Sequence, residues 1–261
     1  MEYHGIVVGV DGSESGFEAL RQALLLLPPD GVLHAVTVID NTAAVHAGAG
    51  SQAVAELNAD ALRARDEAAR MLEGRTRCET HLIHGVPAST LLAVAKREQA
   101  DLLVVGGHHR SRTAGILLAG TMTTVLHESP CSVLLAIIRR GEVWRPRRII
   151  VGLDGSAYAL AALAVADELA GRFDGSVSTV AALGGKLIAR EGEWTARVSE
   201  WPKVHPVDAL DDASATADLV VIGSRGLHGV KALGSVGERV AHRARCSVLL
   251  VRPNTPMGVE R

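Results

Sequence analysis

The chain alternates between short apolar runs and longer segments whose apolar positions recur at helical spacing. Residues 5–10 and 32–39 are almost continuously apolar, which predicts strands buried on both faces of a sheet. Between them, Ser13 and the two glutamates of segment 14–27 are typical of a capped helix start. Apolar positions three or four apart predict a second helix over 52–73. Strands alternating with helices predict a parallel sheet with both faces covered.

The same pattern continues through the first half of the chain and is then repeated. The further elements expected are a strand at 77–85, a helix at 88–98, a strand at 101–106, a helix near 120–128 and a strand at 131–137. Three blocks recur in the same order: IVVGVDGSESGFEAL (6–20) as IIVGLDGSAYALAAL (149–163), ADLLVVGG (100–107) as ADLVVIGS (217–224), and VLHESPCSVLLA (125–136) as VAHRARCSVLLV (240–251). Ordered repetition of this kind indicates two copies of one domain.

The repeats predict a domain at 1–138, a linker at 139–147 and a second domain at 148–261. The arginine-rich stretch around Pro146 is interpreted as an exposed, solvated hinge rather than a nucleic-acid contact. Matched blocks lie 143 residues apart at the first block and 117 at the second, so the second copy lacks 26 residues. The loss falls where the first copy has its second helix, and the second domain is therefore a trimmed one.

Composition narrows the classes of function. A formal charge of −2 predicts no attraction to nucleic acid or to an anionic membrane, and two Phe, two Tyr and three Trp provide few surfaces for base stacking. Three widely spaced cysteines suit a reducing compartment and predict neither disulfides nor a zinc site. Asp11 interrupts the apolar run near the N-terminus, so we expect no signal peptide and a cytoplasmic location.

Two repeated signatures converge if the strand order is 3-2-1-4-5. G-x-D-G-S follows the first strand of each copy and a glycine-rich loop follows the fourth, and ligands bind where the order reverses between these two strands. In the second copy the loop from Gly223 to Ser235 contains Arg225 and Lys231 and leads into a helix, which favours phosphate binding. A glycine-rich turn in which Ser235 only caps the helix is the alternative.

These motifs, together with GVPASTLL (85–92) and the closing VLHESPCSVLL, resemble the universal stress proteins in their tandem two-domain form. The resemblance implies two Rossmann-like domains that bind ATP, with or without Mg²⁺. It places the first-strand aspartate and the main chain ending the second strand beside adenosine, and the loop glycines and hydroxyl beside ribose and phosphates. The residues carried over are Asp11, Gly12, Val38, Gly106 and Gly120 in the first copy, and Asp154, Gly155, Ala182, Gly223, Arg225, Gly226, Gly234 and Ser235 in the second.

Both copies depart from the family's loop pattern, G-x2-G-x9-G-[ST]. In the first, a gapless alignment puts His109 at the second glycine and Ala119–Gly120 at the final pair. In the second, only seven residues separate Gly226 from Gly234. We expect phosphate recognition in the second domain, because Ala119 and His109 fill space that glycine leaves open.

The expected function is therefore adenine-nucleotide binding by a stress-response sensor without efficient turnover. A nucleotide-free interaction protein of the same fold, acting on a regulatory protein partner, is the first alternative, and a slow ATPase is the second. The chain has no P-loop motif, and Asp11 and Asp154 are expected to bind or cap rather than to catalyse or hold a metal. The last strand of each copy would be an apolar edge strand, which invites pairing. The resemblance implies that such edges meet across a twofold axis, so we expect the two strands to pair antiparallel in an intrachain pseudo-dimer, with a homodimer left open.

Overall fold

The computed structural model describes residues 3–42, 50–107, 115–139, 141, 143–184, 193–224 and 235–253, with the backbone alone at 115–119. The chain packs as two compact units, Glu2–Pro130 and Cys131–Arg261. Each unit is an α/β layer built on a mostly parallel sheet, which confirms the predicted fold class. None of the helices in these described stretches is both long and apolar enough to cross a membrane.

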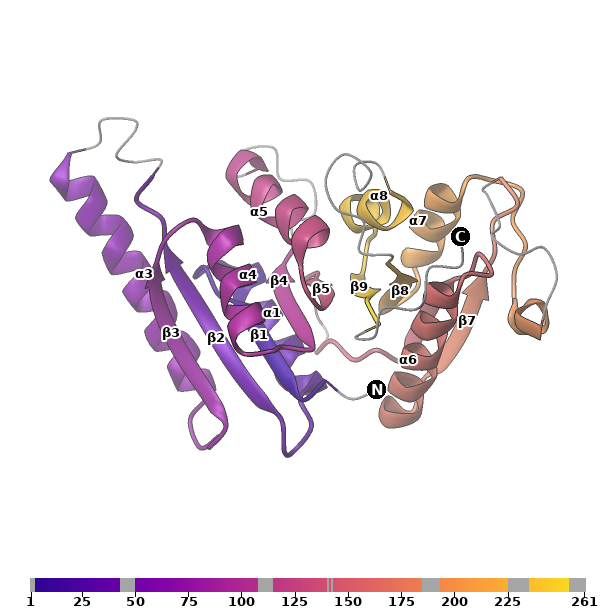
Figure 1. Ribbon diagram of the computed structural model, residues 1–261, viewed down its shortest axis with the longest axis horizontal. Coiled ribbons are helices and arrows are strands. Elements are labelled where there is room, and N and C mark those ends of the chain that lie inside the picture. Colours follow the sequence, from indigo (N-terminus) through magenta and orange to yellow (C-terminus); the bar gives the residue numbers. More distant parts are fainter. Residues whose placement is uncertain are drawn as a thin grey trace. The chain divides into compact units, whose positions relative to one another are not determined.

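The first unit alternates strands and helices along the chain. Its elements are β1 (Gly5–Gly9), α1 (Glu14–Leu26), β2 (Val32–Ile39), α3 (Ser51–Met71), β3 (Cys78–His84), α4 (Pro87–Arg97), β4 (Leu102–Gly106) and α5 (Gly115–Glu128). The strands are parallel in the order β3-β2-β1-β4, with Val8 of β1 opposite both Ala35 and Val104. Helix α3 runs beside β2 and β3, and α4 runs across the sheet near β1 (Figure 1). The order agrees with the prediction and brings the ends of β1 and β4 together.

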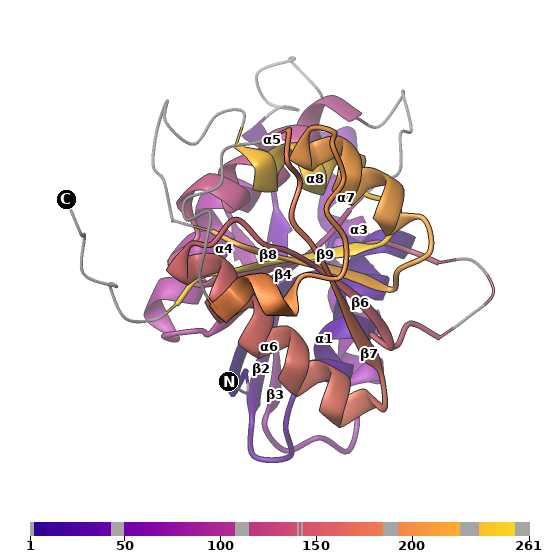
Figure 2. The ribbon, with the colours of Figure 1, turned by 90° about the vertical axis from the view of Figure 1, so that its right-hand side faces the viewer.

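The second unit has one strand from the first repeat and the whole of the second. Its elements are β5 (Ser132–Ala136), β6 (Arg148–Gly152), α6 (Ala157–Phe173), β7 (Ser176–Val180), the 3₁₀ helix η1 (Glu193–Arg197), α7 (Pro206–Ser214), β8 (Leu219–Gly223), α8 (Val236–Arg243) and β9 (Ser247–Val251). The strand order is β5-β9-β8-β6-β7. Helix α6 lies on one side of these strands and α7 with α8 on the other (Figure 2).

The final strands of the two repeats pair antiparallel, as predicted. Leu134 of β5 lies opposite Leu249 of β9, and these two leucines hold the same position in their repeats. The hydrogen bonds of buried serines repeat this twofold relation: Arg252 N–H donates to Ser132 Oγ at 3.1 Å, and Ile137 N–H donates to Ser247 Oγ at 3.1 Å. Strand β5 thus packs with the second unit, whereas the predicted repeat boundary at residue 138 follows it; that boundary remains a prediction about the sequence repeat.

A third strand position survives in the trimmed repeat, which the sequence pattern did not indicate. Segment 199–204 runs beside β7 and forms a parallel bridge to its last residue. Ala181 N–H donates to the Glu200 carbonyl at 3.0 Å, and Leu183 N–H donates to the Pro202 carbonyl at 2.8 Å. Pro202 fits this position because it lacks only the main-chain N–H, and the bond to Leu183 uses its carbonyl. The 26 residues that the second repeat lacks therefore correspond to α3. Among the described residues at this place of the second repeat, the only helical element is the 3₁₀ helix η1.

The helix predicted near 120–128 begins earlier, at Gly115, and this prediction was wrong at its start. Residues 116–119, Ile-Leu-Leu-Ala, favour helix, and no Ser, Thr, Asp or Asn stands at position 120 to cap a later start. In the second repeat the corresponding helix α8 begins at Val236, directly after the capping residue Ser235. The two loops after the fourth strands therefore lead into helices that start at different positions of the repeat.

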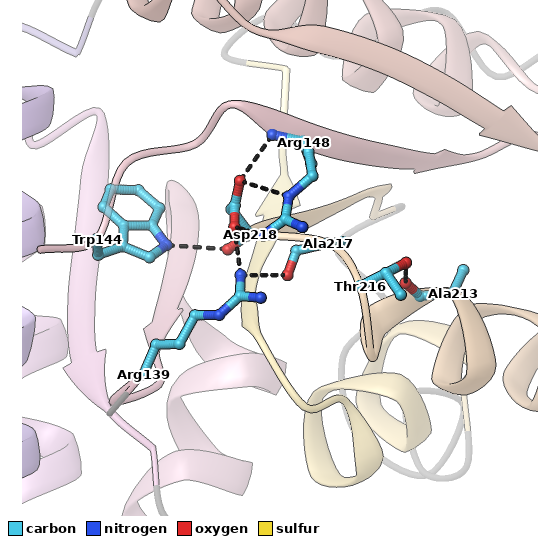
Figure 3. A network of polar contacts seen from close by, with 7 residues as sticks. All are labelled: Arg139, Trp144, Arg148, Ala213, Thr216, Ala217 and Asp218. Carbon is cyan, nitrogen blue, oxygen red and sulfur yellow. Dashed lines mark hydrogen bonds and ion pairs between the residues drawn. The ribbon is translucent and has the colours of Figure 1, made fainter. Parts of the chain in front are cut away.

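The prediction of an exposed, solvated linker at 139–147 was wrong for the residues that contact the start of β8. Trp144 is buried, and its Nε1–H donates to the main-chain carbonyl of Asp218 at 2.9 Å. Arg139 bonds the Asp218 carboxylate, which also accepts from Arg148 N–H and from its guanidinium, each at 2.8 Å (Figure 3). A single buried carboxylate thus attaches the linker and β6 to the start of β8.

The same aspartate explains why A-D-L appears in both repeats. In the first unit, Asp101 Oδ2 accepts from Gly5 N–H at 3.0 Å, and Gly5 occupies the position of Arg148. In each repeat the carboxylate before strand 4 therefore accepts the first N–H of strand 1. The motif fixes the pairing of the two strands whose far ends form the predicted site.

Candidate functional site

The aspartate of each G-x-D-G-S motif lies in the turn that follows the first strand. Asp11 Oδ1 accepts from Ser13 N–H at 3.0 Å, and Asp154 Oδ1 accepts from Ser156 N–H at 3.0 Å. Each serine caps the next helix by accepting an N–H of its first turn with Oγ. Asp11 is exposed, whereas Asp154 is half-buried. One oxygen of each carboxylate thus shapes the turn, and the side chains stand at the carboxyl edge of the sheet.

The glycine of the same motif is required by the backbone. Gly12 has φ +81° and Gly155 has φ +79°, a left-handed conformation that residues with a Cβ rarely adopt. A Cβ on Gly12 would also lie 3.1 Å from Cβ of Ala64 in α3. These two glycines of the predicted site therefore serve the turn, and in the first unit Gly12 also allows α3 to approach it.

The first loop glycine of each repeat packs a strand against a helix. A Cβ on Gly106 would lie 2.6 Å from the carbonyl group of Ser15 in α1, and one on Gly223 would lie 2.3 Å from that of Tyr158 in α6. Any side chain would have to displace backbone at these positions. Helix–strand packing by itself therefore explains why both repeats have glycine at this position, whether or not a ligand is bound.

Ser235 stands at the N-cap of α8, a position that both the phosphate interpretation and the capping alternative predict. Its Oγ accepts from Glu238 N–H at 3.2 Å. This bond uses an acceptor lone pair, so the hydroxyl hydrogen can donate to a phosphate oxygen. Glu238 places a carboxylate in the first turn, where it opposes an incoming anion. Gly120, at the matching position of the first repeat, lies inside α5 and cannot offer a helix N-terminus.

The two residues predicted to lie beside adenosine, at the end of the second strand of each repeat, differ in burial. Val38 is half-buried near the end of β2, opposite Ile83 of β3. Ala182 is buried just after β7, between the two residues whose N–H groups donate to segment 199–204. Of the other predicted site residues, Arg225, Gly226 and Gly234 lie outside the described residues, as do Lys231 and His109.

The carboxyl edge of the first unit also has an amide pair that sequence reasoning missed. Asn41 Nδ2 donates to Asn58 Oδ1 of α3 at 3.1 Å, which joins the end of β2 to that helix. Asn41 Oδ1 is buried and has no hydrogen-bond partner among the described residues. The position of Asn41 three residues after Val38 was the available signal, but the pairing depends on the packing of α3.

A second missed cluster lies on β2 and β3, toward the start of the strands. His34, Glu79 and His81 bring ring nitrogens and a carboxylate oxygen within 4.8 Å of one another. Burial lowers the pKa of His81, and the neighbouring His34 lowers it further. Nothing in the spacing of these three residues along the chain indicated that they meet.

Each repeat is a Rossmann-like α/β fold with an aspartate turn after its first strand and a glycine at the end of its fourth strand. Residues 2–136 and 187–252 match the model described as the Universal stress protein family. The chain therefore belongs to the universal stress protein family. The second match begins at residue 187, after Asp154 and Ala182.

Individual relatives cover almost the whole chain. A universal stress protein of Mycobacterium tuberculosis (strain ATCC 25618 / H37Rv) is 28% identical, over 95% of this chain and 97% of its own. One from Mycolicibacterium smegmatis is 27% identical, over 96% and 97%. The crystal structure of a universal stress protein from Archaeoglobus fulgidus DSM 4304 has a TM-score of 0.74 at 21% identity, covering 97% of this chain and 98% of that one, and this likeness concerns the fold.

Proposed function

We propose that this universal stress protein binds an adenine nucleotide, ATP, as a ligand-responsive regulator and does not turn it over efficiently. The observation that carries the proposal is the position of Ser235 at the N-cap of α8, in the repeat where Gly223 ends β8 and Asp154 follows β6. Strand 1 and strand 4 end side by side in this sheet, where open α/β folds bind ligands. The second unit is therefore the proposed phosphate site.

The phosphate end of the ligand would use the free N–H groups and the dipole of α8. An anion at a helix N-terminus gains from both, and the Ser235 hydroxyl adds a donor. Glu238 acts against this attraction, so we expect modest affinity rather than tight binding. The backbone at Ala182 would lie on the adenosine side, by its equivalence with Val38.

Hydrolysis is not favoured by the groups at this edge. Asp154 accepts the Ser156 N–H within its turn, which uses one of its oxygens for structure rather than for activating water. The sequence has no P-loop lysine to stabilise a phosphoryl group in transfer. We expect fewer than roughly one turnover per minute, against about 1 to 10³ per second for ordinary enzymes.

Ser235→Asp separates phosphate binding from helix capping. Aspartate caps helices as well as serine does, so α8 should keep its stability, while the new charge repels phosphate. Loss of the hydroxyl donor alone should weaken ATP binding roughly ten- to a hundredfold in calorimetric titration. Glu238→Gln is the matched opposite and should strengthen binding about two- to fivefold by removing a like charge.

Different outcomes point to different conclusions. ATP binding that is unchanged in Ser235→Asp but lost in Asp11→Ala would move the site to the first unit. If the unmodified protein releases no nucleotide on denaturation, by mass spectrometry, and takes up no ATP, the nucleotide-free interaction protein replaces the proposal. Multiple turnovers at ordinary enzyme rates would contradict the sensor assignment.

A further inference from the structure

Three ligand atoms from neighbouring strands of the first unit surround one point. His34 Nδ1 lies 3.0 Å from His81 Nε2, and Glu79 Oε2 lies 3.8 Å from each of these nitrogens. A circle through three atoms at these separations has a radius of about 2.1 Å, which is the usual distance from Zn²⁺ to imidazole nitrogen and carboxylate oxygen. An ion at its centre, or slightly out of the plane, would contact all three atoms without movement of the strands.

We propose that His34, Glu79 and His81 bind Zn²⁺. Two imidazoles and one carboxylate are a ligand set that zinc prefers, and three protein ligands leave a fourth position for water. The Glu79 side chain is 65% exposed, so this fourth position can face solvent. Glu98 Oε2 lies 3.7 Å from the other nitrogen of His34. At this distance the carboxylate does not hydrogen-bond the imidazole, but its negative charge favours a cation bound nearby.

The ligands stand on paired strands, away from Val38, the residue of the first unit that was predicted to lie beside adenosine. His34 is the third residue of β2 and precedes Val38 by four residues, about 13 Å along a strand. In the register of the sheet Glu79 lies opposite His34, and His81 follows two residues later on the same face. Because the strand pairing fixes these positions, binding would need little reorganisation of backbone.

The second repeat lacks the cluster, although it keeps the same strand register. Glu200 pairs with Val180 as His81 pairs with Val36, so the counterparts can be read directly. His34, Glu79 and His81 are replaced by Ser178, Val198 and Glu200. The cluster is therefore found in the first repeat and not at the matching positions of the second. Packing at this place does not by itself require histidines.

The competing explanation is a polar contact without metal. His34 and His81 can share a hydrogen bond, because one ring nitrogen donates and the other accepts. Arg97 Nε donates to Glu98 Oε1 at 2.6 Å, which neutralises part of the negative charge near the site. The metal-free contact predicts no saturable affinity for zinc, and this difference decides between the two.

The test is zinc titration of the full chain after treatment with a chelator and desalting. Competition with a chromophoric chelator should give one Zn²⁺ per chain, and Co²⁺ in its place should show the absorption bands of a four-coordinate ion. Glu79→Gln, nearly isosteric and exposed, should weaken binding at least about tenfold. His81→Ala should abolish the site, whereas His84→Ala, an exposed histidine of the same strand, should leave it intact.

Thermal unfolding supplies a second readout that does not depend on the chelator. Bound zinc should raise the midpoint of the wild-type first unit and leave that of His81→Ala unchanged, because only a ligand of the folded state stabilises it. Circular dichroism checks that each variant is folded. Absence of a saturable site in the folded wild-type protein, or zinc affinity that Glu79→Gln and His81→Ala do not alter, would overturn the proposal.

Discussion

Replacing Asp218 by asparagine tests how firmly the linker and β6 are held to β8 within the second unit. Asp218 is only 8% exposed and its carboxylate accepts from Arg139 and from both the main chain and the side chain of Arg148. Asparagine keeps the shape but removes the charge and turns one acceptor into a donor that faces other donors. The substitution therefore isolates electrostatics from packing.

The expected cost follows from the kind of bonds lost. Hydrogen bonds to a charged group contribute about 1.5 to 3 kcal/mol each, and an uncompensated buried partner costs more. The Arg148 side chain is 53% exposed, however, so water replaces part of what its guanidinium loses. We expect Asp218→Asn to lower the free energy of unfolding of the second unit by about 2 to 3 kcal/mol at pH 7.

The effect should depend on pH with a definite sign. Burial by itself raises the pKa of Asp218, but the hydrogen bonds and charge of Arg148, with the charge of Arg139, outweigh it and lower the pKa below its ordinary value. Such a group stabilises the fold above its unfolded-state pKa, and the stabilisation is lost as the pH falls through the folded-state value. The difference between wild type and Asp218→Asn should therefore shrink below about pH 3.9.

Tryptophan fluorescence reports this transition selectively. All three tryptophans, at 144, 194 and 201, belong to the second unit, whereas circular dichroism detects both units. Urea titrations at several pH values give the free energy of unfolding for each variant. Asp212→Asn, an exposed carboxylate in the same unit, is the control and should change stability by less than about 0.5 kcal/mol. A loss at Asp218 no larger than the control's, or a difference independent of pH, would refute the reasoning.

Three further predictions concern packing. Gly223→Ala should destabilise the second unit by about 3 kcal/mol, because the new Cβ meets the Tyr158 backbone. Gly120→Ala, whose Cβ meets nothing within 4 Å, should instead stabilise α5 by about 0.5 to 1 kcal/mol. Denaturant titrations should give changes in the free energy of unfolding of opposite sign for the two variants, and changes of the same sign would contradict the packing argument. Ser247→Ala removes the acceptor of the Ile137 N–H and should cost about 1 kcal/mol in the same titration; no change would count against the β5–β9 contact. Burial raises the pKa of Cys246 to about 12, so this thiol should resist alkylation at pH 8 until denaturant is added, and rapid native-state labelling would disprove its burial.

The sequence by itself determined the elements and their order. Continuous apolar runs and the 3.6-residue period are local, and the runs predicted each strand of the first repeat to within one or two residues. Capping is also local, which is why Ser13 was recognised before the structure was known. Repetition of whole blocks predicted two copies of one fold. The apolar edge strands, with the resemblance to the universal stress proteins, predicted the antiparallel pairing of β5 with β9.

Tertiary structure decided the features that depend on which backbones meet. Segment 199–204 serves as a strand through its main-chain groups, which side-chain patterns do not report. Gly223 is needed because the Tyr158 backbone lies against it, and this distance exists only in the folded unit. Asp218 collects its arginines, and His34 meets His81, only through strand register and docking. Contacts between residues far apart in the chain arise from packing, whereas periodicity records only which face of an element is buried.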